Sequence, residues 1–432
     1  APSKRPLVLL ANAHHYSLRM PHIDPKRLLN SLSEMAKIGG TQKGGVCRLA
    51  ATAEDKTARD LFTLWAKTEN CEISIDQIGN IFARRPGKNN NLAPVVLGSH
   101  LDSQPTGGKF DGTYGVLAAL EVIRCLNDSG VETDRPVEAV SWTNEEGSRF
   151  PPAMMGSGVF SGSLNLEKAL STQDINGISI GEALDAINYA GEHLCGNRAI
   201  HTYLEAHIEQ GPILERENTT IGVVLGIQGI RWFDIIIQGR EAHAGPTPMP
   251  ARNDALIAAS DLILKIENIA LQHAPDGRTT VGTVDTHPNS RNVIPGQVKL
   301  GIDMRHPDAG VLSAMKKELQ AVLEKIRKER GVKGNIDEIW YSPPTIFDAE
   351  TVDTVETMAT LRQYTCRRIT SGAGHDAKYM ADICPTAMIF IPCDEGLSHN
   401  EAENAKDEHL VAGAQVLLDV ALARAGTLNA DS

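Results

Sequence analysis

Short apolar runs alternate with amphipathic segments through the first half of the chain. Periodic apolar positions predict helices at 57–68 and 115–127, and apolar runs predict strands at 73–83, 95–98 and 137–142. Helices that alternate with buried strands are typical of an α/β fold with a mostly parallel central sheet. Such sheets bind ligands at the carboxyl ends of their strands, so we expect the functional residues there.

The pattern changes after residue 229. It predicts, in order, a strand, a helix, two strands, a helix and a strand, at 232–238, 252–273, 279–285, 297–305, 308–330 and 336–341. This β-α-β-β-α-β order is that of a ferredoxin-like domain. An α/β pattern then returns, with an apolar run at 386–391. The sequence therefore predicts a discontinuous α/β domain, residues 1–228 and 342–432, which is interrupted by an inserted domain at 229–341.

The net charge indicates which kinds of binding partner to expect, and the cysteines indicate which cellular compartment. A net charge of -12 over 432 residues argues against nucleic acid or an anionic membrane as a partner, because either requires a basic surface. The seven cysteines include no Cys-x-x-Cys pair, which favours reduced thiols in a cytoplasmic protein. The apolar run at 7–11 is too short for a signal peptide, and no run approaches the roughly 18 apolar residues of a membrane span.

Histidine and carboxylate side chains follow two of the predicted strands. The strand predicted at 95–98 leads into Gly-Ser-His100-Leu-Asp102, and a glycine-rich loop after it contains Asp111. The strand predicted at 137–142 leads into the adjacent Glu145 and Glu146. Imidazole and carboxylate together are the ligands of zinc and of manganese-like ions, and clustered anions are costly without a cation. The pattern predicts a metal site, and a polar loop with a capping aspartate and a solvated glutamate pair is the alternative.

Three further histidines occupy loop positions after apolar runs or glycines. They are His207 in His-Ile-Glu-Gln-Gly, His399 in Leu-Ser-His-Asn-Glu, and His375 in Ser-Gly-Ala-Gly-His-Asp. A lone histidine is more often a core or surface residue, but the glycines before His375 let a backbone approach a ligand closely. We therefore group these three with the candidate metal site.

Seven motifs in order resemble the amidase/hydantoinase/carbamoylase branch of the M20 metallopeptidase-like enzymes. They are Gly-Ser-His100-Leu-Asp102, Gly-Gly-Lys-Phe-Asp111-Gly, Asn-Glu145-Glu146-Gly-Ser-Arg-Phe, His207-Ile-Glu-Gln-Gly-Pro, Ala-His243-Ala-Gly, Asn292-Val-Ile-Pro-Gly and Gly-Ala-Gly-His375-Asp. The resemblance spans residues 39–418. Within the branch, the chain is most similar to N-carbamoyl-L-amino acid amidohydrolases and β-ureidopropionases.

This resemblance implies a site for two divalent metal ions in each subunit, which zinc, manganese, cobalt or nickel would fill. Asp111 would bridge the two ions. His100 and His207 would complete the ligands of one ion, and Glu146 and His399 those of the other. The resemblance also implies a homodimer, with the inserted domain serving both as dimerisation domain and as lid.

Three other residues receive roles from the same resemblance. The carboxylate of Asp102 would fix the imidazole tautomer of His100. Glu145, which is adjacent to a ligand but is not one itself, would be the general base. His243, in the inserted domain, would stabilise the oxyanion, often across a dimer interface.

A second group of residues is expected to bind the substrate. Arg305 ends a predicted strand, and a guanidinium suits a bidentate grip on a carboxylate, so we assign it to the substrate carboxylate together with Asn292 and Gln210. A surface salt bridge is the alternative for Arg305. His375 is expected near the carbamoyl group.

The predicted reaction is hydrolysis of the carbamoyl C–N bond of N-carbamoyl amino acids, which gives the amino acid, ammonia and carbon dioxide. A ureido carbon is a poor electrophile because two nitrogens donate into it, and a pair of ions both activates water and polarises the oxygen. An allantoate-type amidohydrolase and an M20 aminoacylase or dipeptidase remain alternatives. A catalytically inactive binding or scaffold protein is a further alternative, against which the intact Glu145 and the five ligands argue.

Overall fold

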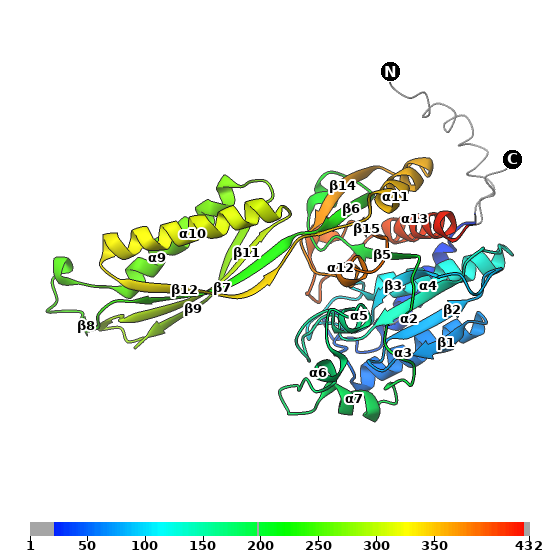
Figure 1. Ribbon diagram of the computed structural model, residues 1–432, viewed down its shortest axis with the longest axis horizontal. Helices are drawn as coiled ribbons and strands as arrows, with labels where there is room; N and C mark the ends of the chain where they lie inside the picture. Colours follow the sequence, from blue (N-terminus) through cyan, green and yellow to red (C-terminus); the bar gives the residue numbers. More distant parts are fainter. Residues whose placement is uncertain (1–20, 197, 427–432) are drawn as a thin grey trace, which may run out of the picture. The chain divides into compact units, whose positions relative to one another are not determined.

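The computed structural model describes residues 21–196 and 198–426, so the apolar run at 7–11 lies outside the described residues. The chain divides into two compact units, which we call the larger unit (Ala1–Gly226 with Ile346–Ser432) and the smaller unit (Ile227–Thr345). Figure 1 labels the elements of both. All seven cysteines lie within the described residues, and they are free thiols.

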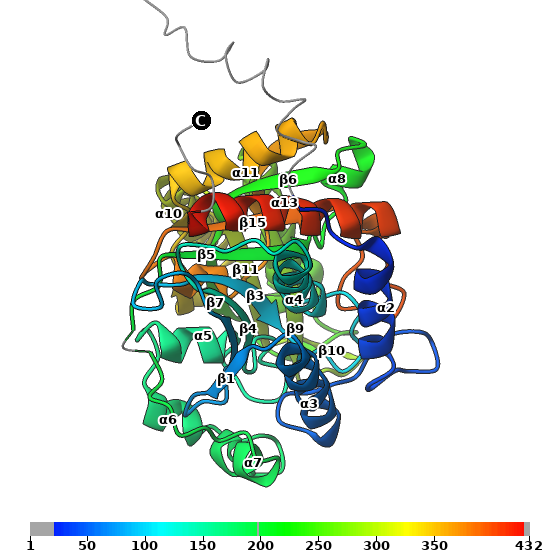
Figure 2. The same ribbon diagram turned by 90° about the vertical axis from the view of Figure 1, so that its right-hand side faces the viewer.

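The larger unit is built on a sheet that has nine strands within the described residues, in the order β1-β2-β4-β3-β5-β15-β6-β13, with β14 beside β6. The strands are β1 (Glu72–Ile75), β2 (Ile81–Arg85), β3 (Val95–His100), β4 (Val137–Trp142), β5 (Thr202–Ile208), β6 (Ile221–Ile227), β13 (Thr345–Ile346), β14 (Cys366–Ser371) and β15 (Thr386–Ile391). The neighbours β4, β3, β5 and β15 are parallel, whereas β2 and β6 join them antiparallel. The prediction of a mostly parallel sheet is confirmed, and Figure 2 shows β15 between β5 and β6.

Every residue of β3, β4, β5 and β15 is buried, as expected for parallel strands that are covered on both faces. The helices of this unit are α2 (Pro25–Ala36), α3 (Ala53–Thr68), α4 (Thr113–Asp128), α5 (Met155–Phe160), α6 (Leu166–Leu170), α7 (Ile180–Ala186), α8 (Ile213–Arg216), α11 (Ala349–Leu361), α12 (Ala377–Met380), α13 (Asp407–Ala425) and the 3-10 turn η2 (Asp394–Gly396). The helices α4 and α13 pack on the central strands. The helices expected at 57–68 and 115–127 are confirmed as α3 and α4.

The single strand expected at 73–83 is wrong, because β1 and β2 form an antiparallel hairpin there. The carboxylate of Asp76 accepts the backbone N–H groups of Ile78 and Asn80. Gly79 adopts a positive φ of 85°, which glycine does without steric cost. Aspartate hydrogen bonds of this kind close turns, and the apolar Ile78 hid the turn within an apparently continuous run.

The smaller unit has the predicted β-α-β-β-α-β order. Its elements are β7 (Gly229–Gln238), α9 (Ala255–Gln272), β9 (Arg278–His287), β11 (Gln297–His306), α10 (Ala309–Arg330) and β12 (Lys333–Ser342), with the short β8 (Ala242–His243), β10 (Val293–Ile294) and η1 (Met249–Ala251) in the connections. The sheet order β12-β7-β11-β9, with antiparallel pairs throughout, is that of a ferredoxin-like fold. The inserted ferredoxin-like domain is therefore confirmed.

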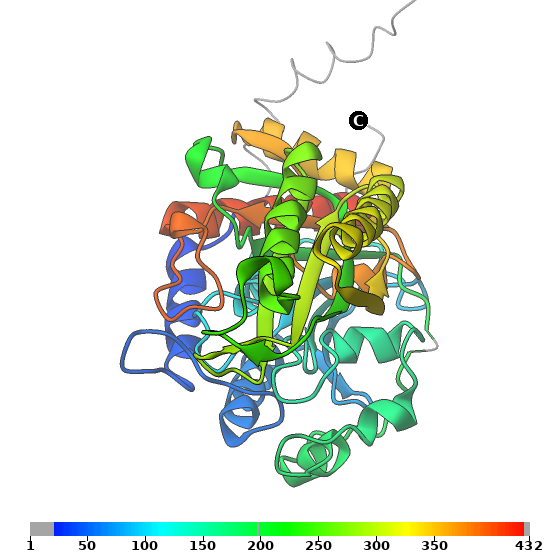
Figure 3. The same ribbon diagram turned by 90° about the vertical axis from the view of Figure 1, so that its left-hand side faces the viewer.

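Two helices lie side by side in the smaller unit (Figure 3) and cover one face of its sheet (Figure 1). They begin at Asp254 and Asp308, whose carboxylates accept N–H groups of the first turn. The core contains Phe233 and Leu300 from the sheet and Leu319 from α10. Among the described residues, no helix combines the length and the apolar composition that a membrane span requires.

Candidate metal centre

Four parallel strands place the candidate ligands at one edge of the larger unit's sheet. His100 is the last residue of β3, and His207 is the penultimate residue of β5. Glu145 and Glu146 follow β4, and His399 follows β15. Since β4, β3, β5 and β15 are adjacent, their carboxyl ends bring these side chains together.

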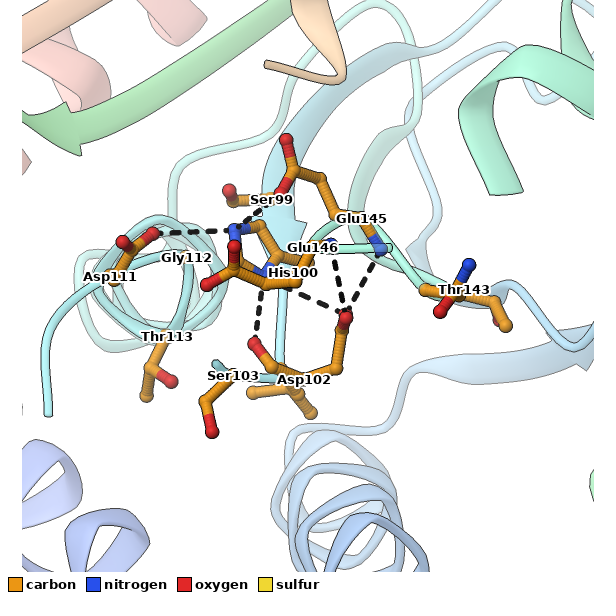
Figure 4. A network of polar contacts seen from close by, with 12 residues as sticks. Ser99, His100, Asp102, Ser103, Asp111, Gly112, Thr113, Thr143, Glu145 and Glu146 are labelled. Atoms are coloured by element: carbon orange, nitrogen blue, oxygen red, sulfur yellow. Dashed lines mark hydrogen bonds and ion pairs between the residues drawn. The ribbon is translucent and has the colours of Figure 1, made fainter. Parts of the chain in front are cut away.

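Asp111 lies between two groups of ligands. Its Oδ1 is 3.5 Å from Nε2 of His100 and 3.2 Å from Nε2 of His207. Its Oδ2 is 3.5 Å from Nε2 of His399, which in turn is 3.2 Å from Oε2 of Glu146. Each oxygen of one carboxylate thus faces a different histidine group, as a bridging ligand requires. Figure 4 shows Asp111 pointing toward His100.

The donor atoms fit divalent ions. Two groups, His100 with Asp111 and His207, and Asp111 with Glu146 and His399, each hold their ligand atoms within 4.8 Å of one another. Imidazole nitrogen and carboxylate oxygen are the ligands that zinc and manganese share. The five residues predicted from the sequence are therefore brought together by the fold in two groups that share Asp111.

The two buried histidines present the same nitrogen to the centre. Nδ1 of His100 lies 2.9 Å from the main-chain oxygen of Asp102, and Nδ1 of His207 lies 2.9 Å from that of Ile208. A carbonyl oxygen only accepts, so these contacts place a proton on Nδ1, and Nε2 is the nitrogen that each ring presents to the centre. The backbone N–H of Gly112 donates to Nε2 of His207 at 3.2 Å. The ring of His100 can take this position only because residue 112 is a glycine, with a φ of 64°. A Cβ on that residue would lie 2.3 Å from the ring.

Asp102 performs two tasks with different groups. Its main-chain oxygen faces His100 Nδ1, whereas its nearest carboxylate oxygen is 3.6 Å from that atom. The carboxylate accepts the backbone N–H groups of Glu145 at 3.2 Å and Glu146 at 3.1 Å (Figure 4). The side chain of Asp102 thus holds the segment that carries the two glutamates. The imidazole of His100 is oriented by the main-chain oxygen of Asp102, and not by its carboxylate as we expected.

Glu145 has the setting of an acid–base group. Its Oε2 lies 3.4 Å from Nε2 of His100. Burial raises the pKa of Glu145 well above its usual range, and the nearby carboxylates of Asp376, Glu146 and Asp102 raise it further, against the opposing effect of His100. A buried carboxyl group with a raised pKa is a candidate for accepting and returning a proton during a reaction.

Asp111 is held in its anionic form. Burial alone favours the neutral acid, but the contacts with His100 and His207 hold the pKa of Asp111 well below its usual range. The pKa of each of these buried histidines is raised by the surrounding carboxylates, although burial opposes this. Asp111 therefore keeps the negative charge that a metal ligand needs.

Two residues that sequence reasoning missed support Asp111. Oε1 of the buried Glu403 accepts the backbone N–H of Asp111 at 3.1 Å and that of Phe110 at 2.9 Å. Ser398 donates its hydroxyl to Oδ2 of Asp111 at 2.8 Å. A Cβ at Gly108 would lie 2.0 Å from the carboxyl carbon of Glu403, so glycine is needed there. The only sequence signal was an acidic residue four positions after His399.

Gln210 and His375, both expected at the substrate, lie beside the ligands. Nε2 of Gln210 donates to Oδ2 of Asp111 at 2.9 Å. His375 is buried, with Nε2 3.0 Å from the hydroxyl of Ser371 and with its ring edge-on to His207 at 4.5 Å. His375 and His207 also form a third group of potential ligands with Glu205.

The other expected substrate residues lie in the smaller unit. His243 and Asn292 are neighbours, because β8 pairs with β10 and the N–H of Ala244 donates to the main-chain oxygen of Asn292 at 3.0 Å. Both side chains are exposed. Arg305 lies on β11 and pairs with Asp303, with Nε 2.7 Å from Oδ1 and Nη2 2.8 Å from Oδ2.

Comparisons with known proteins show the family to which the chain is similar. The model of a family described as peptidase family M20/M25/M40 matches residues 96–423. N-carbamoyl-L-amino-acid amidohydrolase of Rhizobium meliloti is 44% identical over 400 residues, which cover 93% of this chain and 96% of that protein. Allantoate amidohydrolase of Bacillus subtilis (strain 168) is 34% identical over 392 residues, which cover 89% of this chain and 94% of that protein. The crystal structure of an amidase of the hydantoinase/carbamoylase family from Burkholderia multivorans has 55% identity and a TM-score of 0.91, with 94% and 98% of the two chains covered.

Proposed function

Because the chain belongs to peptidase family M20/M25/M40, we propose that it hydrolyses the carbamoyl C–N bond of N-carbamoyl-L-amino acids. Relatives that are amidohydrolases support enzyme activity. The observation that carries the proposal is the position of Asp111, whose Oδ1 and Oδ2 face two separate groups of metal-ligand atoms. This arrangement suits hydrolysis of an unreactive ureido group.

Two divalent ions are part of the proposal. His100, Asp111 and His207 would hold one ion, and Asp111, Glu146 and His399 the other. When bound, such ions polarise the ureido oxygen and lower the pKa of water, so that water attacks at neutral pH. Zinc, manganese, cobalt and nickel all accept this mixture of imidazole and carboxylate ligands.

The residues of the chain move the protons. Glu145 takes a proton from the attacking water as the water oxygen bonds to the ureido carbon, and it passes that proton to the leaving nitrogen as the C–N bond breaks. The carbamic acid that is left decomposes to carbon dioxide and ammonia. His243 donates to the oxyanion that forms on the ureido oxygen. Arg305, with Asn292 and Gln210, holds the carboxylate of the substrate.

Allantoate is the second candidate substrate, since a relative named allantoate amidohydrolase is also similar over most of the chain. Allantoate likewise carries a ureido group and a carboxylate. An ammonia-release assay over N-carbamoyl-α-amino acids, N-carbamoyl-β-alanine, allantoate and dipeptides separates the candidates. The largest kcat/KM should belong to an N-carbamoyl-α-amino acid, chelation should abolish the activity, and one of the four metals should restore it. Preference for allantoate or for a dipeptide would overturn the assignment.

We also propose that the protein is a cytoplasmic homodimer that assembles through the smaller unit. Ile257, Leu264 and Leu271 of α9 are 50%, 66% and 66% exposed, and their seven-residue spacing places them on one face of the helix. The neighbouring β9 is an edge strand of its sheet. A second copy that covers this apolar stripe and edge would remove both from water. The free thiols support a reducing compartment.

A further inference from the structure

The sheet of the smaller unit has one face that the unit's own helices leave uncovered. In β7, Phe233, Ile235 and Ile237 point into the core beneath α9 and α10. Because side chains alternate along a strand, Trp232 and Asp234 point to the opposite face. The same alternation places Asp303 and Arg305 of β11 on this opposite face, which we call the open face (Figure 1).

A tryptophan pair and the expected carboxylate-binding arginine share this open face. Trp232 lies directly across from Asp303 on β11 and from Trp340 on β12. The indole rings of Trp232 and Trp340 are 4.8 Å apart with an interplanar angle of 59°. Nε1 of Trp232 donates to Oδ2 of Asp303 at 2.7 Å, and Arg305 pairs with the same carboxylate. One aspartate therefore fixes the indole pair and the guanidinium relative to each other.

The indole pair forms a confined apolar patch. Trp232 is 42% exposed and Trp340 is 39% exposed. The next row of the open face is charged, since Asp234 on β7 pairs with Lys299 on β11 at 2.7 Å. A contiguous exposed apolar patch with a polar border is a feature of binding sites. Here the border includes a guanidinium, which binds carboxylates.

Resting on the proposed function, we infer that Trp232 and Trp340 form the subsite for the side chain of the substrate whose carboxylate Arg305 holds. The patch and the cation together match a molecule with a carboxylate and a large apolar group a few bonds away. An N-carbamoyl derivative of leucine or phenylalanine has this form, whereas N-carbamoylglycine, N-carbamoyl-β-alanine and allantoate lack the apolar group. The substrate class is therefore N-carbamoyl amino acids with large apolar side chains.

Kinetics with paired substrates test the inference. Wild type should prefer N-carbamoyl-L-phenylalanine over N-carbamoylglycine, and Trp340→Ala should lower kcat/KM for the first about 10- to 100-fold, the range for loss of an apolar pocket contact. The same variant should lower kcat/KM for N-carbamoylglycine much less, so that the preference for the phenylalanine derivative falls. Ile339→Ala is the matched control, because Ile339 is an exposed apolar residue of the same strand that is not paired with Trp232. Equal loss for both substrates, or no loss for either, would overturn the subsite.

A second variant separates the ring from its hydrogen bond. Trp232→Phe keeps an aromatic face but removes the N–H that Asp303 accepts. The variant should retain most of the preference for the phenylalanine derivative. It should also raise KM for both substrates, because Asp303, which positions Arg305, loses its hydrogen bond with residue 232. Sedimentation of Trp340→Ala checks the competing role of the pair in a subunit interface, and conversion of a dimer to monomers would overturn the subsite.

A binding measurement distinguishes failure of the subsite from failure of the proposed function. If wild type releases no ammonia from any N-carbamoyl amino acid, the proposed reaction fails. Calorimetry of the zinc-loaded wild type with N-acetyl-L-phenylalanine and N-acetylglycine then judges the subsite alone. Tighter binding of the phenylalanine compound that Trp340→Ala abolishes supports the subsite, and equal binding of the two compounds overturns it.

Discussion

Nδ1 of His100 lies 2.9 Å from the main-chain oxygen of Asp102 and 3.6 Å from the nearest carboxylate oxygen of that residue. The imidazole is thus oriented by a group that no side-chain substitution removes. Asp102→Asn should therefore retain the bound metal. It should still lower kcat, by about 10- to 100-fold, because an amide offers one acceptor oxygen where the carboxylate serves both Glu145 and Glu146. Elemental analysis alongside turnover checks this, and loss of metal from the variant would contradict it.

Glu145→Gln should separate catalysis from metal binding. The amide keeps the size of the side chain but cannot take a proton, so kcat should fall by about 10²- to 10⁴-fold while the metal content stays unchanged. Glu146→Gln is the matched control, because Glu146 belongs to a ligand group and its loss should reduce the metal content. A Glu145→Gln enzyme that has lost metal would reassign Glu145 to the ligands.

Glu403 should matter through the oxygen it presents to the Asp111 loop. Glu403→Gln keeps an acceptor oxygen for the two backbone N–H groups and should bind metal nearly as tightly as wild type. Glu403→Ala leaves those N–H groups without this acceptor and should weaken metal binding about 10- to 100-fold. Metal titration of the two variants makes the comparison. Equal metal affinity in both would show that Asp111 is positioned without Glu403.

Metal binding should strengthen as the pH rises toward 9. The hydrogen bond with Glu146 raises the pKa of His399 to about 9, although burial opposes this. Below that pH the metal-free ring is protonated, and an ion must displace the proton to use the nitrogen. Addition of zinc to metal-free protein at pH 7 should therefore release protons, and the apparent affinity should increase between pH 6 and 9. A pH-independent affinity over this range would be inconsistent with a protonated His399.

Leu264→Asp should convert the proposed dimer into monomers. Leu264 lies at the centre of the exposed stripe of α9, so a charge there would be buried in a dimer but solvated in a monomer. Leu64→Asp is the matched control, because Leu64 is 58% exposed on α3 of the larger unit. Sedimentation velocity distinguishes the two states. A monomeric wild type, or a dimer that persists in the Leu264 variant, would rule out this interface.

The sequence predicted those elements and residues that a pattern within a short stretch of the chain reveals. Runs rich in apolar residues marked β3 and β4, and His100 and Glu146 come at or shortly after the ends of these strands. Both strands and these two candidate ligands were therefore visible in the sequence. The turn at Asp76 was missed because its hydrogen bonds are made by a polar side chain within an apolar run. The contact of Glu403 with Asp111 joins residues 292 positions apart. The sequence showed only an acidic residue four positions after His399, and it did not indicate Asp111 as the partner of that residue.

The pairing of Arg305 with Asp303 shows a different limit of sequence reasoning. Arg305 was identified as a cation at the end of a strand, with a surface salt bridge as the alternative to substrate binding. The structure shows such an ion pair, with Asp303 as the partner that the sequence reasoning did not name. That pairing follows from strand alternation, which puts both side chains on one face. Trp232 joins them only through the register of β7 against β11, which sequence alone does not give.

The position of β15 between β5 and β6 has a consequence for synthesis on the ribosome. The chain makes β5 and β6 first, then the whole smaller unit, and only then the strand that separates them. Until β15 emerges, β5 has an edge of unpaired backbone groups. The ligand group of His100, Asp111 and His207 is already complete at that stage, whereas the group that needs His399 is not. The residues of the two candidate ligand groups are therefore complete at different moments of synthesis, those of one group before the smaller unit and those of the other after it.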